Sequence, residues 1–275
     1  MSRERITDPL TPSSQFPREH PMIATAPLSP ILLATTEAEW RIVLESRYGG
    51  SRDSTPDLLH ALERESFHGP CEHDPTLLVL SSGSATGKTH FGRYLHQLGW
   101  QRVARHKDRP ARTDEVDGID AHFVDKATFD QMVEQNELVG LTGSYGDRRG
   151  YHLPSIRTVL ESGSRCVSSD GYSIVRLLTA TPSLAATRVL SVFLLPPDIP
   201  TLLNRITRRA LERITPDNGR TVDACFADEK IIERLREGPR YLRQAFDHTD
   251  SGRPLVDRFV VYDQPDRVAK LLGIR

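Results

Sequence analysis

The sequence lacks long hydrophobic runs and contains little cysteine, methionine or tryptophan. Its 275 residues include 3 cysteines, 3 methionines and 2 tryptophans, and no apolar stretch approaches the roughly 20 residues that a bilayer-spanning helix needs. Cys71, Cys166 and Cys225 are far apart and show no CxxC or metal-ligand spacing, which argues against a disulfide framework. The N-terminus has no secretory-signal pattern. We therefore expect a cytoplasmic protein with no membrane partner.

The sequence also lacks an excess of either charge. It has 36 Lys+Arg against 37 Asp+Glu, a formal net charge of -1, so its overall charge gives no reason to expect a nucleic-acid partner. Any anion-binding site must be built locally. The length suits one large α/β domain with an extension, and nothing in the sequence indicates an oligomeric state.

The N-terminal part differs in composition from the rest. Six prolines fall within residues 1–30 among Ser, Thr and charged residues, a composition that buries little apolar surface. Helical patterns follow at Thr36–Ser46 and Pro56–Glu65, which we expect to pack on the core or to act as a lid. We predict an N-terminal extension over residues 1–74, partly disordered with short helices, and a catalytic domain over residues 75–275.

From Leu77 onward, strand-like apolar runs alternate with helical patterns, which predicts a parallel sheet with crossover helices. The predicted strands are Leu77–Leu80, Gly99–Ala104, Arg165–Ser168, Thr187–Leu195 and Arg258–Tyr262.

A phosphate-binding loop is predicted directly after the first of these strands. Gly87-Lys88-Thr89 fits the end of the Walker A pattern, in which backbone N–H groups converge on phosphate at a helix N-terminus. The first glycine position holds Ser82 instead, with glycine one residue later. The alternative is a Ser/Gly-rich turn with a solvated lysine.

If the loop binds ATP, Lys88 would contact the β- and γ-phosphates and Thr89 would hold Mg²⁺. The predicted ATP-binding residues are Gly83, Ser84, Ala85, Thr86, Gly87, Lys88 and Thr89.

A second charged segment is a candidate acceptor site. Arg109 and Arg112 are three residues apart and could clamp one phosphate, while Glu115 could accept paired donors from a base. A nucleoside monophosphate has both features. The alternatives are surface arginines and a solvated loop acid.

This segment resembles the GMP-binding segment of guanylate kinases, whose pattern is Thr-Thr-Arg-x-x-Arg-x-Gly-Glu-x-x-Gly-x-Asp-Tyr-x-Phe. The residues that match are Arg109, Arg112, Glu115, Gly118, Asp120 and Phe123. The resemblance extends over roughly residues 77–270, with the phosphate loop, the Arg-x-x-Arg-x-x-Glu segment and Phe193-Leu194-Leu195-Pro196-Pro197 in the family's order.

The resemblance implies roles for individual residues. Arg109 and Arg112 would hold the acceptor phosphate, Glu115 would read the base, and Asp170 would lie beside it. The family's lid and post-lid arginines, which stabilise transition-state charge, correspond to Arg205, Arg209 and Arg234.

Three departures fall in the acceptor pocket. Ala121 stands where the family has a phosphate-binding Tyr, Gly140 where it has a base-side Glu, and Arg148-Arg149 where it has Tyr-Tyr. The two arginines add positive charge, so we include Arg148 and Arg149 among the predicted substrate-binding residues.

Together these features predict a three-layer α/β P-loop kinase with a parallel core sheet, an acceptor-binding insertion near residues 105–150 and a lid near residues 205–235. The predicted activity is transfer of the γ-phosphoryl group of ATP, with Mg²⁺, to GMP or a related purine nucleotide. One alternative is another phosphorylated small molecule as acceptor, favoured by the pocket changes. The other is a non-catalytic binding module, against which the retention of Lys88 and Thr89 argues.

Overall fold

The computed structural model describes most of the chain from residue 30 onward. The described residues are 30–49, 53–67, 75–112, 115–118, 120–144, 147–169, 171–184, 186–211 and 229–274.

The core is a five-stranded parallel sheet with the order β2-β7-β1-β8-β9. Its strands are β1 (Leu77–Ser81), β2 (Gln101–Arg102), β7 (Cys166–Ser168), β8 (Val189–Leu195) and β9 (Arg258–Val261). All five lie within or overlap the predicted strands, which confirms the parallel core sheet. Strands β1 and β8 could be predicted from their apolar runs because central parallel strands are buried on both faces.

Helices cover both faces of this sheet. In β1, Leu78 and Leu80 pack with α3 (Lys88–Gln97) and α10 (Pro265–Leu271), whereas Leu77 and Val79 pack with helices on the other side. Those are α5 (Leu153–Glu161) and α6 (Ser173–Ala180), followed by the 3-10 turn η1 (Pro182–Leu184). Alternate residues of a strand point to opposite faces, so the fold has three layers, as predicted.

The two N-terminal helices pack on the core. Helix α1 (Pro30–Tyr48) shares a hydrophobic cluster with α7 (Ile199–Leu211) and α9 (Glu229–Ala245). Helix α2 (Thr55–Ser66) lies along β9, the last strand of the sheet, where Phe259 N donates to Ser66 Oγ at 3.0 Å and Val261 N to Glu63 Oε1 at 2.9 Å. Side chains of α2 thus satisfy the exposed edge of the sheet. The division of the chain at residues 74 and 75 stays a prediction.

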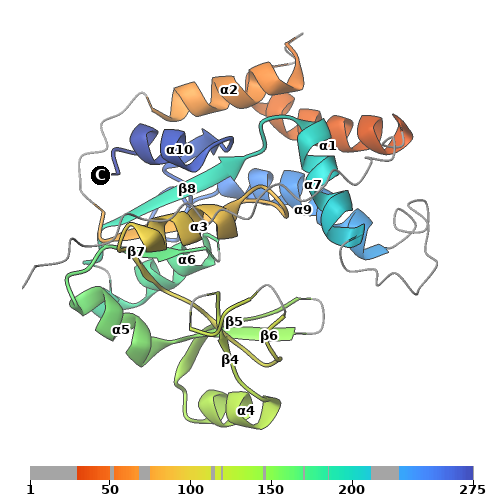
Figure 1. Ribbon diagram of the computed structural model, residues 1–275. Coiled ribbons are helices and arrows are strands. Elements are labelled where there is room, and N and C mark those ends of the chain that lie inside the picture. Colours follow the sequence, from red (N-terminus) through yellow and green to blue (C-terminus); the bar gives the residue numbers. More distant parts are fainter. Residues whose placement is uncertain are drawn as a thin grey trace, which may run out of the picture.

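A second sheet forms a separate lobe with α4 (Lys126–Glu134) (Figure 1). Its order is β4-β3-β6-β5, made of β4 (His122–Phe123), β3 (His106–Lys107), β6 (Asp147–His152) and β5 (Leu138–Ser144). Strand β3 is parallel to β4 and antiparallel to β6, and β5 is antiparallel to β6. The predicted insertion near residues 105–150 corresponds to this lobe.

Of the predicted lid, α7 and the part of α9 from Glu229 are described, and residues 212–228 lie outside the described residues. Within the described part of the chain, no helix is long and apolar enough to cross a membrane.

Candidate functional site

The predicted phosphate loop joins the buried strand β1 to helix α3. Gly87 has a φ of 121° at the first residue before the helix, and Ala85 has a φ of 60°. A Cβ at Gly87 would overlap the ring of Tyr262, so glycine is required here for its conformation and for the space it leaves. The loop geometry therefore depends on Tyr262, which follows β9.

The loop also explains why serine stands at the first glycine position. Ser82 is buried, and its hydroxyl donates to Gly83 O at 2.8 Å and accepts from Lys88 Nζ at 2.9 Å. At the next position a Cβ would lie 2.6 Å from Gly238 Cα of α9, closer than atoms can approach. Residue 82 has room for a side chain and residue 83 has none.

Lys88 lies folded onto the loop. Its Nζ donates to Ser82 O at 2.8 Å and to Gly83 O at 3.1 Å, as well as to the serine hydroxyl. Because the ammonium group of Lys88 donates here to oxygen atoms, it could donate to phosphate oxygens in their place. Thr89, the second residue of α3, is exposed, and its hydroxyl is an oxygen ligand of the type that Mg²⁺ prefers.

Two helices bring the predicted catalytic arginines toward the loop. Arg205 Nη1 of α7 donates to Thr86 O at 3.4 Å, and Arg209 lies one turn further along the same helix face. Arg234 lies on α9, which passes Gly83 at Gly238. Of the three, Arg205 has a described contact with the phosphate loop.

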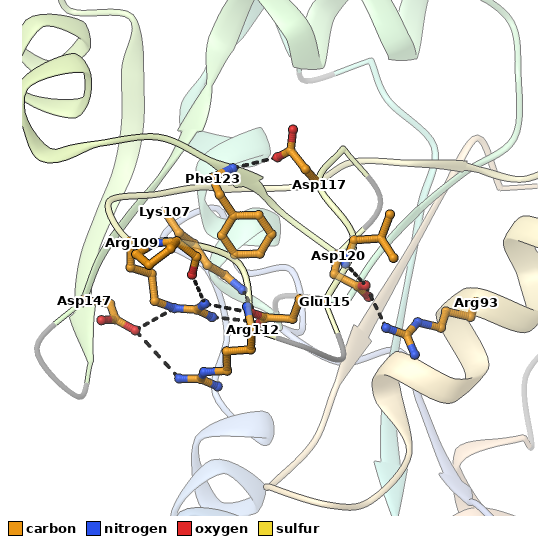
Figure 2. Close-up of polar contacts among 11 residues, drawn as sticks. Arg93, Lys107, Arg109, Arg112, Glu115, Asp117, Asp120, Phe123 and Asp147 are labelled. Carbon is orange, nitrogen blue, oxygen red and sulfur yellow. Dashed lines mark hydrogen bonds and ion pairs between the residues drawn. The ribbon is translucent and has the colours of Figure 1, made fainter. Parts of the chain in front are cut away.

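Three of the predicted acceptor residues, Arg109, Arg112 and Glu115, form one charged cluster in the lobe of the second sheet (Figure 2). The guanidinium of Arg109 binds both oxygens of Glu115, at 2.6 and 2.8 Å, and its Nε lies 2.9 Å from Asp147. Arg112 donates its backbone N–H to Glu115 at 3.0 Å, and its side chain lies 3.9 Å from Asp147. The structure thus brings Arg109, Arg112 and Glu115 together.

The electrostatics of this cluster hold Glu115 ionised. Burial would raise the pKa of Glu115, but hydrogen bonds from Arg109 and from the Arg112 N–H, with the charge of Lys107 3.5 Å away, lower it to about 2. Lys107 and Asp147 were not among the predicted site residues. Asp147 belongs to no motif that would have marked it. Lys107 could have been predicted as a site residue, because it lies two residues before Arg109.

The adjacent arginines Arg148 and Arg149 lie on opposite faces of β6. Arg149 pairs across strands with Lys107, so both side chains lie on the face that carries Glu115. Arg148 points the other way, with Nε 2.6 Å from Asp108 Oδ2 and its guanidinium 4.9 Å from the ring centre of Phe129 in α4. The structure therefore places Arg149 with the acceptor cluster and does not place Arg148 there.

An ion pair joins the acceptor segment to the helix of the phosphate loop. Arg93 Nη2 of α3 lies 2.7 Å from Asp120 Oδ2, and the same oxygen accepts from Val116 N at 2.9 Å (Figure 2). Burial opposes ionisation of Asp120, but the hydrogen bonds from Arg93 and from Val116 N–H, with the charge of Arg102, outweigh it, so the pKa of Asp120 is lowered. The donor and acceptor regions are thus held side by side through α3.

At the predicted base side of the pocket, Gly140 and the buried Arg105 both lie against Tyr151. Gly140 has a φ of +61°, and a Cβ there would lie 3.4 Å from the Tyr151 ring, so a glutamate would be strained at this position. Beside it, the guanidinium of the buried Arg105 lies 4.7 Å from the centre of the Tyr151 ring and donates to Thr142 Oγ1 at 3.0 Å and to Ser173 Oγ. Sequence reasoning missed Arg105. The predicted base-side residue Asp170 lies outside the described residues.

Three histidines of the second sheet lie in contact. The rings of His122 and His152 are 4.7 and 5.5 Å from that of His106. Burial and these two neighbours lower the pKa of His106 to about 4, against a smaller opposing effect of Asp117. Among the described residues, no group of three or more His, Cys, Asp or Glu side chains is arranged to hold a metal ion.

Comparison with known proteins agrees with this geometry. The model of the family described as guanylate kinase matches residues 74–223, more than half of the chain. The chain belongs to the guanylate kinase family. The match begins just before β1 and includes the phosphate loop and the whole acceptor lobe.

Individual relatives show the same similarity over part of their length. A guanylate kinase of Rhodopseudomonas palustris (strain ATCC BAA-98 / CGA009) is 34% identical over 136 residues, which cover 49% of this chain and 60% of that protein. One from Nitrobacter hamburgensis is 34% identical over 152 residues, covering 54% and 68%. The crystal structure of guanylate kinase from Anaplasma phagocytophilum has a TM-score of 0.46 at 17% identity, covering 72% of this chain and 82% of that one. The matched region thus spans less than two thirds of the first relative.

Proposed function

We propose that this member of the guanylate kinase family transfers the γ-phosphoryl group of ATP to the phosphate of a nucleoside monophosphate, with GMP as the first candidate. The observation that carries the proposal is the cluster of Lys107, Arg109 and Arg112 around Glu115, held beside the phosphate-loop helix through the Arg93–Asp120 ion pair. The proposed donor and acceptor sites thus lie next to each other, as transfer between two phosphates would require.

The residues divide the work between donor and acceptor. The backbone of Gly83 to Thr89 would cradle the phosphates of ATP, and Lys88 would leave its three oxygen partners for phosphate oxygens. Thr89 would hold Mg²⁺, which supplies charge neutralisation on the phosphates when bound. Arg205, at the phosphate loop, with Arg209 and Arg234, would stabilise negative charge during transfer.

On the acceptor side, phosphate must compete with carboxylates. Arg109 and Arg112 both contact Asp147, and Arg109 also binds Glu115. An incoming phosphate would replace Asp147 as the partner of the two guanidiniums, because its oxygens accept the same forked hydrogen bonds. Arg149, on the same face, would add a further cation.

A second candidate acceptor is a phosphorylated molecule without guanine. Two observations favour it: Glu115 is bound on both oxygens by Arg109, and residue 140 is a glycine of positive φ beside the buried Arg105 system. Both features reduce the carboxylate available to read the donor groups of guanine.

The test is ADP release by the purified chain with ATP and Mg²⁺ across GMP, IMP, AMP and phosphorylated sugars. Turnover of GMP supports the first candidate, and turnover of another acceptor alone supports the second. Silence with every acceptor, together with ATP binding, would point to a binding module. Lys88→Ala should lower kcat by at least about 100-fold, and an enzyme that keeps full activity without this lysine would refute the phosphate-loop mechanism.

A further inference from the structure

Helix α1, helix α9 and the phosphate loop are in direct contact through one residue each: Trp40, Gly238 and Gly83. A Cβ at Gly83 would lie 2.6 Å from Gly238 Cα, and a Cβ at Gly238 would lie 2.5 Å from Cζ2 of Trp40. Both distances are shorter than atoms can adopt, so the two glycines allow direct contact. The loop backbone rests on the α9 backbone, which rests on the indole ring.

Trp40 is held in this place by packing. Its side chain is fully buried in a cluster with Val43 and Leu44 of α1 and with Leu235 and Leu242 of α9. Its indole Nε1 has no hydrogen-bond partner among the described residues. The ring therefore acts through its shape.

Helix α9 depends on such support at this point. Pro239 lies inside the helix and has no N–H, so the helical hydrogen bond to the carbonyl of residue 235 cannot form. Gly238 weakens the same turn further. Because Pro239 and Gly238 weaken the backbone bonding of the helix here, its path depends more on side-chain packing, and Trp40 lies directly against this turn. Arg234, one turn earlier on the same face, moves with that path.

We infer that Trp40 is a positioning residue of the nucleotide site: through Gly238 it sets how closely α9 and Arg234 approach the phosphate loop at Gly83. The N-terminal helix α1 is accordingly a structural part of the ATP site. The predicted effect on kcat rests on the proposed function, whereas the predicted effect on the Kd for ATP requires only that the loop binds ATP.

The first experiment compares Trp40→Leu with Ile42→Ala, a change on the same helix at a residue that is 61% exposed. Trp40→Leu should lower kcat and raise the Kd for ATP, each on the order of tenfold, without changing the KM for the acceptor. Ile42→Ala should change none of these. Calorimetric titration with ATP, steady-state kinetics and thermal melting are measured on all three proteins. A Trp40→Leu protein that melts earlier but keeps the kcat and ATP affinity of the control would overturn the inference.

A second variant addresses the contact itself. Gly238→Ala should also weaken ATP binding, because its methyl group meets the indole, and the loss should be smaller when Trp40 is already leucine and leaves more room. Additive losses would overturn the inference even if the single variants are unstable.

ATP titration also separates the two proposals. A chain that phosphorylates no acceptor but binds ATP with a Trp40-dependent Kd would refute the proposed function and support this inference. A chain that binds no ATP would refute both.

Discussion

The two adjacent arginines of β6 provide the sharpest test of the acceptor site. Arg149→Met removes a cation from the face that carries Lys107, and Arg148→Met removes one from the opposite face. A charge-assisted hydrogen bond to phosphate contributes about 1.5–3 kcal/mol, so Arg149→Met should raise the KM for the acceptor by about 10- to 100-fold. The KM for ATP should not change.

Arg148→Met should give the reverse result. Arg148 binds Asp108 and Asp130 and lies over Phe129, and its loss would leave the buried carboxylate of Asp108 without this partner. We expect a lower melting temperature and unchanged kinetic constants. Steady-state kinetics and thermal melting of both variants provide the comparison. The face assignment would be refuted if Arg148→Met raised the acceptor KM as much as Arg149→Met.

Three further predictions concern stability and pH. Gly87→Ala should lower the free energy of unfolding by about 2–4 kcal/mol, because the methyl group is strained at positive φ and overlaps the Tyr262 ring. Gly99→Ala, which shares the positive φ but has nothing within 4 Å, should cost less. Equal losses in denaturant titration would contradict the predicted overlap with Tyr262. The pKa of Glu115 falls from 4.5 to about 2 on folding, so its contribution to stability is present above pH about 4.5 and is lost toward pH 2. Glu115→Gln should therefore lower stability at pH 6 and less so at pH 3, and a pH-independent difference would refute the pairing. The pKa of His106 falls from 6.5 to about 4 on folding, so the free energy of unfolding should decrease as pH falls from about 6.5 to 4. In denaturant titrations at pH 7.5, 5.5 and 4.5, His106→Gln should show a weaker dependence of this free energy on pH. The same dependence in both proteins would contradict the predicted role of His106.

The sequence predicted the core sheet well and the acceptor lobe poorly, for a physical reason. Strands β1 and β8 are buried on both faces and read as apolar runs. Strands β3 and β4 have two residues each, His106–Lys107 and His122–Phe123, too short to show a period. The lobe could be predicted only from the family resemblance.

The same difference applies to the candidate site. The Walker A pattern has a fixed spacing, because one turn supplies all its contacts, so Gly83 to Thr89 could be proposed from sequence alone, and their binding of ATP stays a prediction. The opposite orientations of Arg148 and Arg149 depend on the register of β6 with β3, which sequence alone did not provide. Trp40 packs against Gly238 of α9, nearly 200 residues later in the chain, and Gly238 in turn lies against Gly83. No local sequence pattern could reveal this relation.

Helix α3 links the two halves of the proposed reaction. Its first two residues are Lys88 and Thr89, and Arg93 of the same helix holds Asp120 of the acceptor segment. The side chain of Asp120 is 5% exposed and that of Arg93 is 43% exposed, so the carboxylate is fixed in the lobe while the guanidinium reaches it from the surface of the helix. Movement of the acceptor lobe away from the phosphate loop would have to break this pair or take Arg93 with it. If the two regions bind donor and acceptor as proposed, helix α3 and the Arg93–Asp120 pair would together set the separation of the two phosphates.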